Sequence, residues 1–378
     1  MRILDRYLLR QFVQVFVICF ISLTGLYIVF DAFTNLDNFM TFAEKNGGLA
    51  RVMTEYYAYR SIYFFDRTSA MLALTAAMFT VTWLQRHNEF TALSAAGLPN
   101  WRILAPVLLG AVAVSISAAA VRELVVPRIQ RELSLEPKDL SGEIARIVRP
   151  TYDHRTDILL RGRQAYAATQ RIRSPDFLLP PSLDRYGRQI IAREAFYHPP
   201  RGDRPGGYLL KAVEQPRHLD EKPSLLFDGE PLVITPYDAP DWLEADQCFV
   251  VTDVGFEQMT VGHNWLQCSS TRQLIAGLRN PSLDFGAEVR VAIHMRMVQP
   301  LLDAALLLLG LPLVLSRENG NLYVAVGLCL LVVVGFSLVV IGAQYLGSIY
   351  LLSPAFAAWL PVLMSVPPVA VLAERFWN

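Results

Sequence analysis

The chain has 378 residues, of which 53% are hydrophobic and 18% charged, and its 34 basic residues balance 34 acidic ones. Soluble domains carry about 25% charged residues, so this deficit of charge indicates a membrane protein. The zero net charge argues against a nucleic-acid-binding protein that depends on a basic surface. None of the four lysines follows a glycine, so the chain lacks a Walker A loop for binding ATP.

Six apolar stretches are long enough to cross a bilayer, since a helical span needs about 20 mainly apolar residues. The predicted spans cover residues 11–30, 64–84, 103–121, 297–315, 322–346 and 355–372. They form two groups of three around a long polar interval. We therefore divide the chain into residues 1–126 with the first three spans, a soluble domain at 127–270, and residues 271–378 with a connecting helix and the last three spans.

Arginines beside the spans orient the chain, because loops on the cytoplasmic side are enriched in basic residues. Those on one side are Arg2, Arg6, Arg10, Arg86, Arg102, Arg317 and Arg375. The first loop on the opposite side also carries Lys45, Arg51 and Arg60, so the bias is modest. An even number of spans places both termini on the arginine-rich side. We predict that both termini are cytoplasmic and that the middle domain lies outside the cytoplasm.

The polar interval has the pattern of an antiparallel β-domain. Short apolar or alternating runs end at Pro, Gly and Asp clusters, and they cover residues 157–172, 187–198, 206–219, 225–237 and 246–259. The runs are too closely spaced for helices between them. This favours a sandwich, a jelly roll or an open barrel over an α/β domain. A helical pattern returns at "STRQLIAGLRN", where Ser270 or Thr271 is the predicted N-cap.

The soluble domain shows no pattern of a catalytic or metal site. Its histidines stand in no metal-ligand spacing such as H-E-x-x-H, and no G-x-S-x-G elbow occurs. We therefore predict no catalytic residue and no metal ligand. Cys248 and Cys268 lie twenty residues apart in this domain. They could pair as a disulfide in an oxidising compartment, and two free thiols are the alternative.

Asp303 lies inside the predicted fourth span, about 9 Å from its outer end at 1.5 Å per residue. A charge near the bilayer centre costs at least about 2.5 to 3.5 kcal/mol on insertion scales, so its position needs a reason. Either Asp303 faces an interior cavity with a functional role, or it pairs with Arg296 or extends to the interface. Both interpretations remain open at this stage.

Charged residues gather where the second and third spans meet the outer surface. Asp66 and Arg67 begin the second span, while Arg122 and Glu123 end the third, and this arrangement predicts a structural ion pair. Four arginines surround the same region, namely Arg122, Arg128, Arg131 and Arg296. Because arginine pairs well with phosphate, they could hold the head group of an anionic lipid. Ordinary anchoring at the interface is the alternative.

The stretch "RHNEFTALSAAGLPNWRI", residues 86–103, separates the second and third spans. Phe90, Leu93 and Gly97 fall on one helical face, and Gly97 followed by a proline predicts the end of a helix. Asn88, or the residue before it, can cap the helix, and Glu89 in the first turn suits its dipole. We predict a short amphipathic helix within 86–100 on the cytoplasmic face. It either docks a cytoplasmic partner or lies on lipid head groups as a linker.

These residues resemble a known family. "NEFTALSAAGLPNWRILAPVLL", residues 88–109, is similar to the coupling-helix region of the lipopolysaccharide-transport permeases, the LptF/LptG (YjgP/YjgQ) family, where N-E-x-x-A-x-x-A-x-G is typical. "ILDRYLLRQFVQVF" and "AAWLPVLM" resemble the first and last spans of that family. Residues 270–315 resemble its return from the soluble domain into the fourth span. The soluble domain itself is similar only in position and β pattern.

The resemblance implies an α-helical inner-membrane protein with six transmembrane helices (3+3) and an inserted all-β, jellyroll-like periplasmic domain. It implies a permease subunit of an ABC exporter, powered by a cytoplasmic ATPase dimer, so that ATP is used by the partner and no cofactor binds this chain. The further implied partners are a second permease subunit, a periplasmic bridge protein with a similar β-fold, and lipopolysaccharide. No nucleic acid is implied.

By the same resemblance, Glu89 would sit in a groove of the ATPase, with Phe90, Leu93 and Gly97 packed around it, and the outer arginines would contact lipid phosphates. Asp303 departs from the family, which is usually apolar at that position. Whether the chain is of the LptF or the LptG type is left open. Two other functions compete: a membrane-anchored scaffold whose β-domain binds an envelope component, and an enzyme that uses Asp303 or a histidine.

Overall fold

The structure is a computed structural model that describes residues 3–44, 48–135, 137, 139–140, 144–181, 187–201, 205–227, 229–260, 263–315 and 322–377. Three of the basic residues from which the orientation was predicted lie outside these residues, namely Arg2, Lys45 and Arg317. The side chain of Arg375 also lies outside them. The chain forms two compact units. One comprises residues 1–129 and 286–378, and the other comprises residues 130–285.

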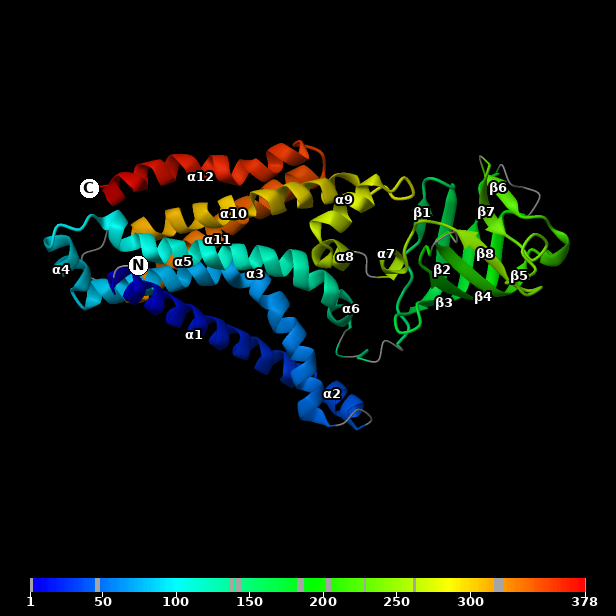
Figure 1. Cartoon of the computed structure of the whole chain (residues 1–378), viewed down its shortest axis with the longest axis horizontal. Helices are drawn as coiled ribbons and strands as arrows, with labels where there is room; N and C mark the ends of the chain where they lie inside the picture. The colour runs from blue at the N-terminus through cyan, green and yellow to red at the C-terminus, as the bar shows by residue number, and fades with distance from the viewer. Residues whose placement is uncertain are drawn as a thin grey trace. The chain divides into compact units, whose positions relative to one another are not determined.

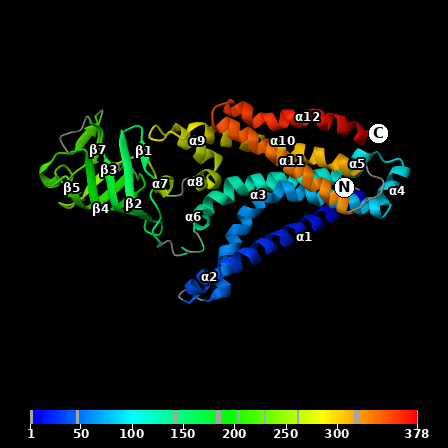
Figure 2. The ribbon, with the colours of Figure 1, turned by 180° about the vertical axis from the view of Figure 1, so that it is seen from behind.

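The first unit is helical (Figures 1 and 2). Its helices are α1 (Ile3–Thr34), α2 (Leu36–Ala43), α3 (Leu49–Arg86), α4 (Glu89–Ala95), α5 (Asn100–Ala120), the π-helix η1 (Val121–Val125), the 3-10 helix η2 (Val126–Ile129), α10 (Gly286–Leu315), α11 (Leu322–Ser348) and α12 (Pro354–Trp377). Helices α10, α11 and α12 lie side by side in both views. The beginning of α1 and the end of α12 lie at the end of the unit that carries α4 (Figure 1).

Five helices among the described residues are long and apolar enough to cross a membrane. They cover Ile3–Thr34, Asn100–Leu133, Gly286–Pro312, Leu330–Ser348 and Pro354–Leu372. The predicted second span, residues 64–84, forms the C-terminal half of α3, which is not among these five. Its apolar stretch carries Ser69, Thr75, Thr80 and Thr82, and these hydroxyl side chains lower the mean hydropathy. Three of these four hydroxyl side chains, those of Ser69, Thr80 and Thr82, are buried inside the unit.

The residues between the first two predicted spans differ from the expected loop. Most of them form α2 and the first half of α3, which is a 38-residue helix. Phe39 of α2 is fully buried and packs on Tyr56 and Tyr57 of α3, with ring centroids 5.1 and 5.8 Å away. The Tyr57 hydroxyl donates to Asp31 Oδ2 of α1 at 2.9 Å. Aromatic packing therefore stabilises α2 and the first half of α3, which lie outside the stretches that hydropathy marks as spans.

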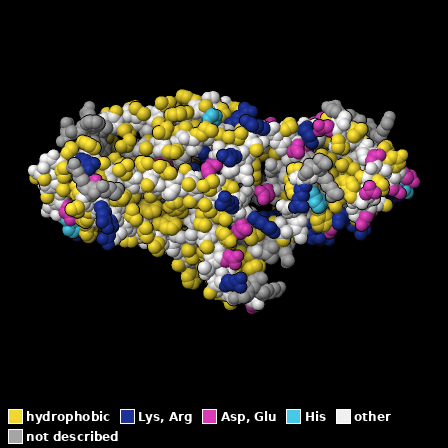
Figure 3. All heavy atoms as spheres, in the orientation of Figure 1, with side chains coloured by type: hydrophobic (Ala, Val, Ile, Leu, Met, Phe, Trp, Pro, Cys, Tyr) yellow, Lys and Arg dark blue, Asp and Glu magenta, His cyan; other side chains and the backbone are white. Residues whose placement is uncertain are grey.

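A continuous apolar core holds the helical unit together. It includes Leu8 and Phe12 of α1, Leu74 and Met78 of α3, Leu104 of α5 and their neighbours. Glycines allow the helices to approach closely: a Cβ at Gly110 would lie 2.7 Å from the Phe12 ring, and a Cβ at Gly310 would lie 2.4 Å from Leu74. Apolar side chains also cover much of the surface of this unit (Figure 3), as expected for contact with lipid.

The second unit contains one antiparallel sheet of eight strands, in the order β1-β2-β3-β4-β5-β8-β7-β6. The strands are β1 (Thr151–Asp153), β2 (Ile158–Tyr166), β3 (Arg171–Leu178), β4 (Gln189–His198), β5 (Gly207–Gln215), β6 (Leu225–Phe227), β7 (Glu230–Ile234) and β8 (Cys248–Val251). Each of the five predicted runs contains at least one strand. Two of the described strands were not predicted: the three-residue β1, which is too short to show an alternating pattern, and β3, of which only Arg171 and Ile172 lie in a predicted run. The chain is thus a membrane-type helical protein with an inserted antiparallel β-domain.

Short helices complete the β-domain, namely α6 (Gln130–Leu133), η4 (Leu219–Glu221), α7 (Phe256–Thr260), α8 (His263–Cys268) and α9 (Thr271–Arg279). The start of α9 confirms Ser270 as the N-cap. Its hydroxyl accepts from the Gln273 N–H at 3.2 Å, and Gln273 Oε1 accepts from the Ser270 N–H at 2.8 Å. This reciprocal capping box satisfies two backbone donors, so the boundary of α9 is encoded locally.

The interior of the β-domain consists of strand side chains that point to one face. The fully buried members include Ile158, Leu160, Phe177, Tyr208 and Val250. Gly207 allows β5 to pair with β8, because a Cβ there would lie 2.1 Å from the carbonyl oxygen of Val250. The consecutive strands β1 to β5 are therefore joined to β8, β7 and β6 through the pairing of β5 with β8, and only glycine fits at position 207 of that pairing.

We expect Leu160→Ala to destabilise the β-domain by about 2 to 5 kcal/mol, because it removes buried methyl groups and leaves a cavity. Leu226→Ala is the matched control, since this strand leucine is 60% exposed. Hydrogen exchange of the strand amides in the detergent-solubilised chain measures the difference. Faster exchange in Leu160→Ala alone supports the assignment of the core, and equal effects of the two variants contradict it.

Candidate functional site

The short helix α4 follows α3 after a reversal at His87 and Asn88. Asn88 has a left-handed backbone (φ 56°), and its side chain makes no capping hydrogen bond. Asn88, one of the two predicted alternatives, is the N-cap residue, but the side-chain hydrogen bond expected of a cap is not formed. Asparagine tolerates this backbone conformation better than most residues, so it also suits the turn.

The end of α4 matches the prediction. Gly97 has φ 83°, and its N–H donates to Ser94 O at 2.9 Å, while the Leu98 N–H donates to Leu93 O at 3.2 Å. These two bonds form a Schellman motif, which requires a left-handed residue and therefore favours glycine. No atom approaches within 4 Å of a Cβ built on Gly97. Its role in this structure is thus to reverse the backbone and not to pack.

The two sides of α4 differ in character. Phe90 and Leu93 are half-buried and pack, together with Leu98, on the core of the helical unit. The outward side consists of small exposed residues, Thr91, Ala92, Ser94, Ala95 and Ala96. A partner that approaches α4 would therefore meet this small-residue surface. Such a surface permits close approach of another helix or groove.

Glu89, the first residue of α4, is half-buried and bonded within the chain. Both carboxylate oxygens accept from the hydroxyl of Tyr7 in α1, Oε2 at 3.0 Å and Oε1 at 3.3 Å. Beyond α4, Arg102 of α5 forms an ion pair with Asp5 of α1, with Nη2 and Oδ2 3.3 Å apart. Tyr7 and Asp5 both lie in the segment "ILDRYLLRQFVQVF", but their contacts with Glu89 and Arg102 were not predicted from it.

Two ion pairs join the helices at the site of the predicted outer arginines. Arg122 of the π-helix η1 donates from Nε to Asp66 Oδ1 of α3 at 2.8 Å, which confirms the expected structural ion pair. Arg296 of α10 lies with Nη1 3.7 Å from Glu123 Oε1. A π-helix places successive residues differently from an α-helix, and here Arg122 and Glu123 both find partners on other helices.

The other two predicted arginines are arranged differently. Arg128 lies in η2 of the helical unit and is exposed. Arg131 lies in α6 of the β-domain, is exposed, and donates from Nη2 to Ala168 O at 3.5 Å. The structure therefore gives Arg122 and Arg296 carboxylate partners, while Arg128 and Arg131 present their guanidinium groups at the surface.

Asp303 is buried, and neither of its partners is an arginine. Its Oδ1 accepts from Gln299 Nε2 at 2.8 Å, one turn earlier in α10, and its Oδ2 accepts from the hydroxyl of Ser115 in α5. The alternative of an ion pair with Arg296 is therefore wrong. Asp303 links α5 to α10 by a hydrogen bond to its carboxylate, which satisfies a polar group inside the unit.

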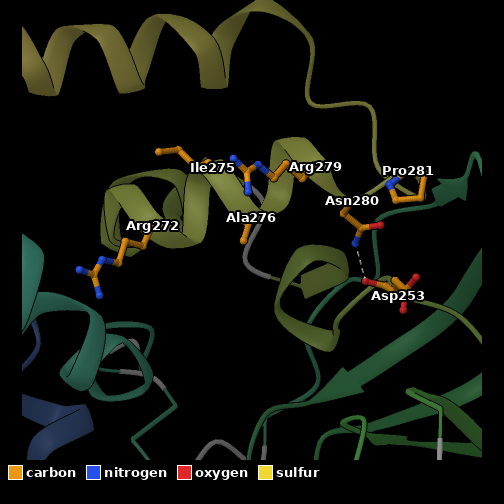
Figure 4. Close-up of a pocket in the computed structure, with 7 residues that line it drawn as sticks. All are labelled: Asp253, Arg272, Ile275, Ala276, Arg279, Asn280 and Pro281. Carbon is orange, nitrogen blue, oxygen red and sulfur yellow. Dashed lines mark hydrogen bonds between the residues drawn. The ribbon is translucent and has the colours of Figure 1, made fainter.

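A shallow pocket of about 430 Å³ lies on the β-domain beside α9 (Figure 4). Its lining comprises Asp253, Arg272, Ile275, Ala276, Arg279, Asn280 and Pro281. Asn280 Nδ2 donates to Asp253 O at 3.1 Å across one end of the pocket. The lining holds no histidine, cysteine or serine, and the described part of the chain has no cluster of three potential metal ligands. The pocket therefore combines one carboxylate and two guanidinium groups with apolar side chains.

The cysteines of the β-domain are not bonded to each other. Cys248 is a free thiol in the buried core, and Cys268 is also buried. Of the two alternatives, the Cys248–Cys268 disulfide is therefore not formed in this structure. Burial raises the pKa of the Cys248 thiol to about 12, because the apolar core disfavours the thiolate.

Together these features define a class of protein: a multi-pass helical membrane protein with an inserted β-domain and a short exposed helix between two of its long helices. A scan against protein families refines this assignment. The family described as lipopolysaccharide export system permease LptF/LptG matches residues 6–148 and 256–375, more than half of the chain, and the chain belongs to this family. It is accordingly a permease and a multi-pass inner-membrane protein. A search of curated proteins gave no match.

We expect Ser115→Ala to destabilise the helical unit by about 1 to 3 kcal/mol, because it removes a donor from the buried Asp303 carboxylate. Ser117→Ala is the matched control, since that hydroxyl bonds only within its own helix, to Val114 O, and is exposed. Thermal unfolding in detergent measures both variants. Equal melting temperatures for the two would show that the contact between α5 and α10 has no stabilising role.

We expect Cys248 in the folded chain to react with iodoacetamide about three orders of magnitude more slowly at pH 8 than in the denatured chain. With a pKa of about 12, almost no thiolate exists at that pH, and the rate should increase about tenfold per pH unit up to the pKa. Mass spectrometry of the Cys248 peptide measures the rate. A Cys248 peptide linked to Cys268, or rapid labelling at pH 8, would contradict this expectation.

Proposed function

We propose that the chain is a permease subunit of an ABC exporter that extracts lipopolysaccharide, or a related anionic glycolipid, from the inner membrane for transport to the outer membrane. The observation that carries this proposal is α4. It lies between the long helices α3 and α5, it presents small residues outward, and it belongs to the part of the chain that matches the permease family. Membership of the family supports the lipid substrate, and α4 supports an external motor.

The motor would be a separate cytoplasmic ATPase dimer that docks on α4, since the sequence has no Walker A loop. Glu89 would accept from a basic or donor-rich groove of the ATPase. A carboxylate offers about four acceptor positions, so Glu89 can bond a partner while it keeps its bond to Tyr7. Phe90, Leu93 and Gly97 would support this contact from the inner side and the end of α4.

The proposed topology has six spans, with the C-terminal half of α3 as the second. A hydroxyl inside this span can bond to its own helix and then does not prevent membrane insertion; Thr80, for example, donates to Ala76 O at 2.7 Å. The beginning of α1, α4 and the end of α12 share one end of the helical unit, which supports an even number of spans (Figure 1). Both termini would be cytoplasmic and the β-domain periplasmic.

In this proposal the β-domain, curled as a jelly roll, receives the lipid and passes it to a periplasmic bridge protein of similar fold. The terminal strands β1 and β6 have one sheet neighbour each, and such strands can pair with a strand of another chain. A second permease subunit of the same family would complete the transporter, either as a heterodimer or as a homodimer. Exposed apolar side chains on α1 and α11 supply surfaces for lipid and for that subunit.

Lipid head groups would contact the outer arginines. Arg128 and Arg131 are exposed and can bind phosphate directly. Arg122 and Arg296 would have to share their guanidinium donors between phosphate and the carboxylates of Asp66 and Glu123. Arginine has five donors, so a paired guanidinium can still accept an additional anion.

The test is co-purification of the chain from its native membrane with whatever binds it. The wild type should retain a cytoplasmic ATPase, and Glu89→Ala should lose it or uncouple its hydrolysis from lipid release by about tenfold or more, the effect of losing one charged contact at an interface. Glu55→Ala is the matched control, an exposed glutamate near the start of α3 and 34 residues from α4. If no ATPase accompanies even the wild type under gentle conditions, a membrane-anchored scaffold becomes the better explanation.

A further inference from the structure

The first two turns of α1 contact both flanks of α4. The Tyr7 hydroxyl bonds both carboxylate oxygens of Glu89, at 3.0 and 3.3 Å, where α4 begins. Asp5 bonds Arg102 at 3.3 Å, in the first turn of the helix that follows α4. The paired residues are 82 and 97 positions apart in the sequence. One short segment of α1 therefore holds the beginning of α4 and the beginning of α5.

Helix α4 has few other means of keeping its orientation. It is seven residues long and has no side-chain N-cap, and helices of that length are not stable on their own. Its packing on the unit depends on the half-buried Phe90 and Leu93. The outward side of α4 consists of small exposed residues. The polar contact from Tyr7 therefore fixes the first turn, which carries Glu89.

The same segment of α1 also packs on the core of the helical unit. Leu8 and Phe12 are almost completely buried, and the Phe12 ring lies against Gly110 of α5. Further along, α1 exposes a series of apolar side chains, Val13, Val17, Ile18, Ile21, Leu26, Val29 and Phe30. A displacement of α4 would thus act on a helix that is buried in the core at its beginning and that, further along, packs on α3 with one side and exposes apolar side chains on the other.

We propose that Tyr7 is a positioning residue that orients the Glu89 carboxylate and joins α4 to α1, with the Asp5–Arg102 ion pair as a second link. This inference rests on the proposed function, in which α4 receives the ATPase. Movement of α4 during the ATPase cycle passes through these links to α1. Tyr7 acts through Glu89 and touches neither lipid nor nucleotide.

The exposure of these contacts separates a positioning role from a purely structural one. The Tyr7 side chain is 42% exposed, and accessible polar contacts of this kind contribute little to global stability. Removal of the hydroxyl should therefore leave the chain folded while it loosens the first turn of α4. Tyr345→Phe is the matched control, because Tyr345 of α11 is also exposed and lies in another helix.

The experiment uses the complete transporter, purified with its ATPase and placed in lipid nanodiscs or vesicles. We expect Tyr7→Phe to retain the ATPase, to speed hydrogen exchange in residues 88–98 by about three- to tenfold, and to lower lipid released per ATP by a similar factor, the size expected for one exposed bond to a charged acceptor. In a Glu89→Ala background, Tyr7→Phe should have no additional effect, because its acceptor is gone.

Unchanged exchange or unchanged release per ATP in Tyr7→Phe overturns the inference. The same holds if Tyr7→Phe and Glu89→Ala have fully additive effects, or if Tyr345→Phe behaves like Tyr7→Phe. Absence of the ATPase from the wild type refutes the proposed function instead. Hydrogen exchange in residues 88–98 still tests the contact between Tyr7 and α4 in that sample, so the two failures are distinguishable.

Discussion

A bilayer offers no hydrogen-bond partners to a polar group, and the arrangement of the helical unit follows from this constraint. Several of its buried polar groups are satisfied from within the unit: Thr80 bonds to its own helix, Asp303 bonds to Ser115 and Gln299, and Asp66 pairs with Arg122. The polar residues of α4 lie at the turn between α3 and α5, whereas the exposed apolar side chains of α1 and α11 lie along the helices.

The two ends of the helical unit use polar contacts for different purposes. At the end with α4, the exposed Tyr7 bonds the half-buried Glu89. At the other end, Arg122 and Arg296 are largely buried and pair with carboxylates on neighbouring helices. An accessible contact can be replaced by a contact with a partner at a small cost in free energy. The loss of one residue of a buried ion pair is strongly destabilising, because it leaves the other charge buried without a partner. The α4 end is therefore the more adaptable one.

Several elements were predictable from short stretches of sequence because their causes are local. The left-handed Gly97 ends α4, Ser270 and Gln273 cap α9, and the alternating runs of the β-domain form strands. The missing side-chain hydrogen bond at Asn88 was not predictable in this way, because it accompanies the left-handed backbone (φ 56°) with which the chain reverses between α3 and α4.

The sequence by itself determined the class of the protein. Hydropathy marked the membrane helices, turn residues marked the strands, and the pattern around Glu89 and Gly97 indicated the family. Tertiary structure alone decided which side of α4 faces outward, that Tyr7 bonds Glu89, and that Asp303 bonds Ser115 at a separation of 188 residues. Such contacts depend on how each long helix is rotated about its axis. That rotation results from packing among all the helices at once, so no local pattern encodes it.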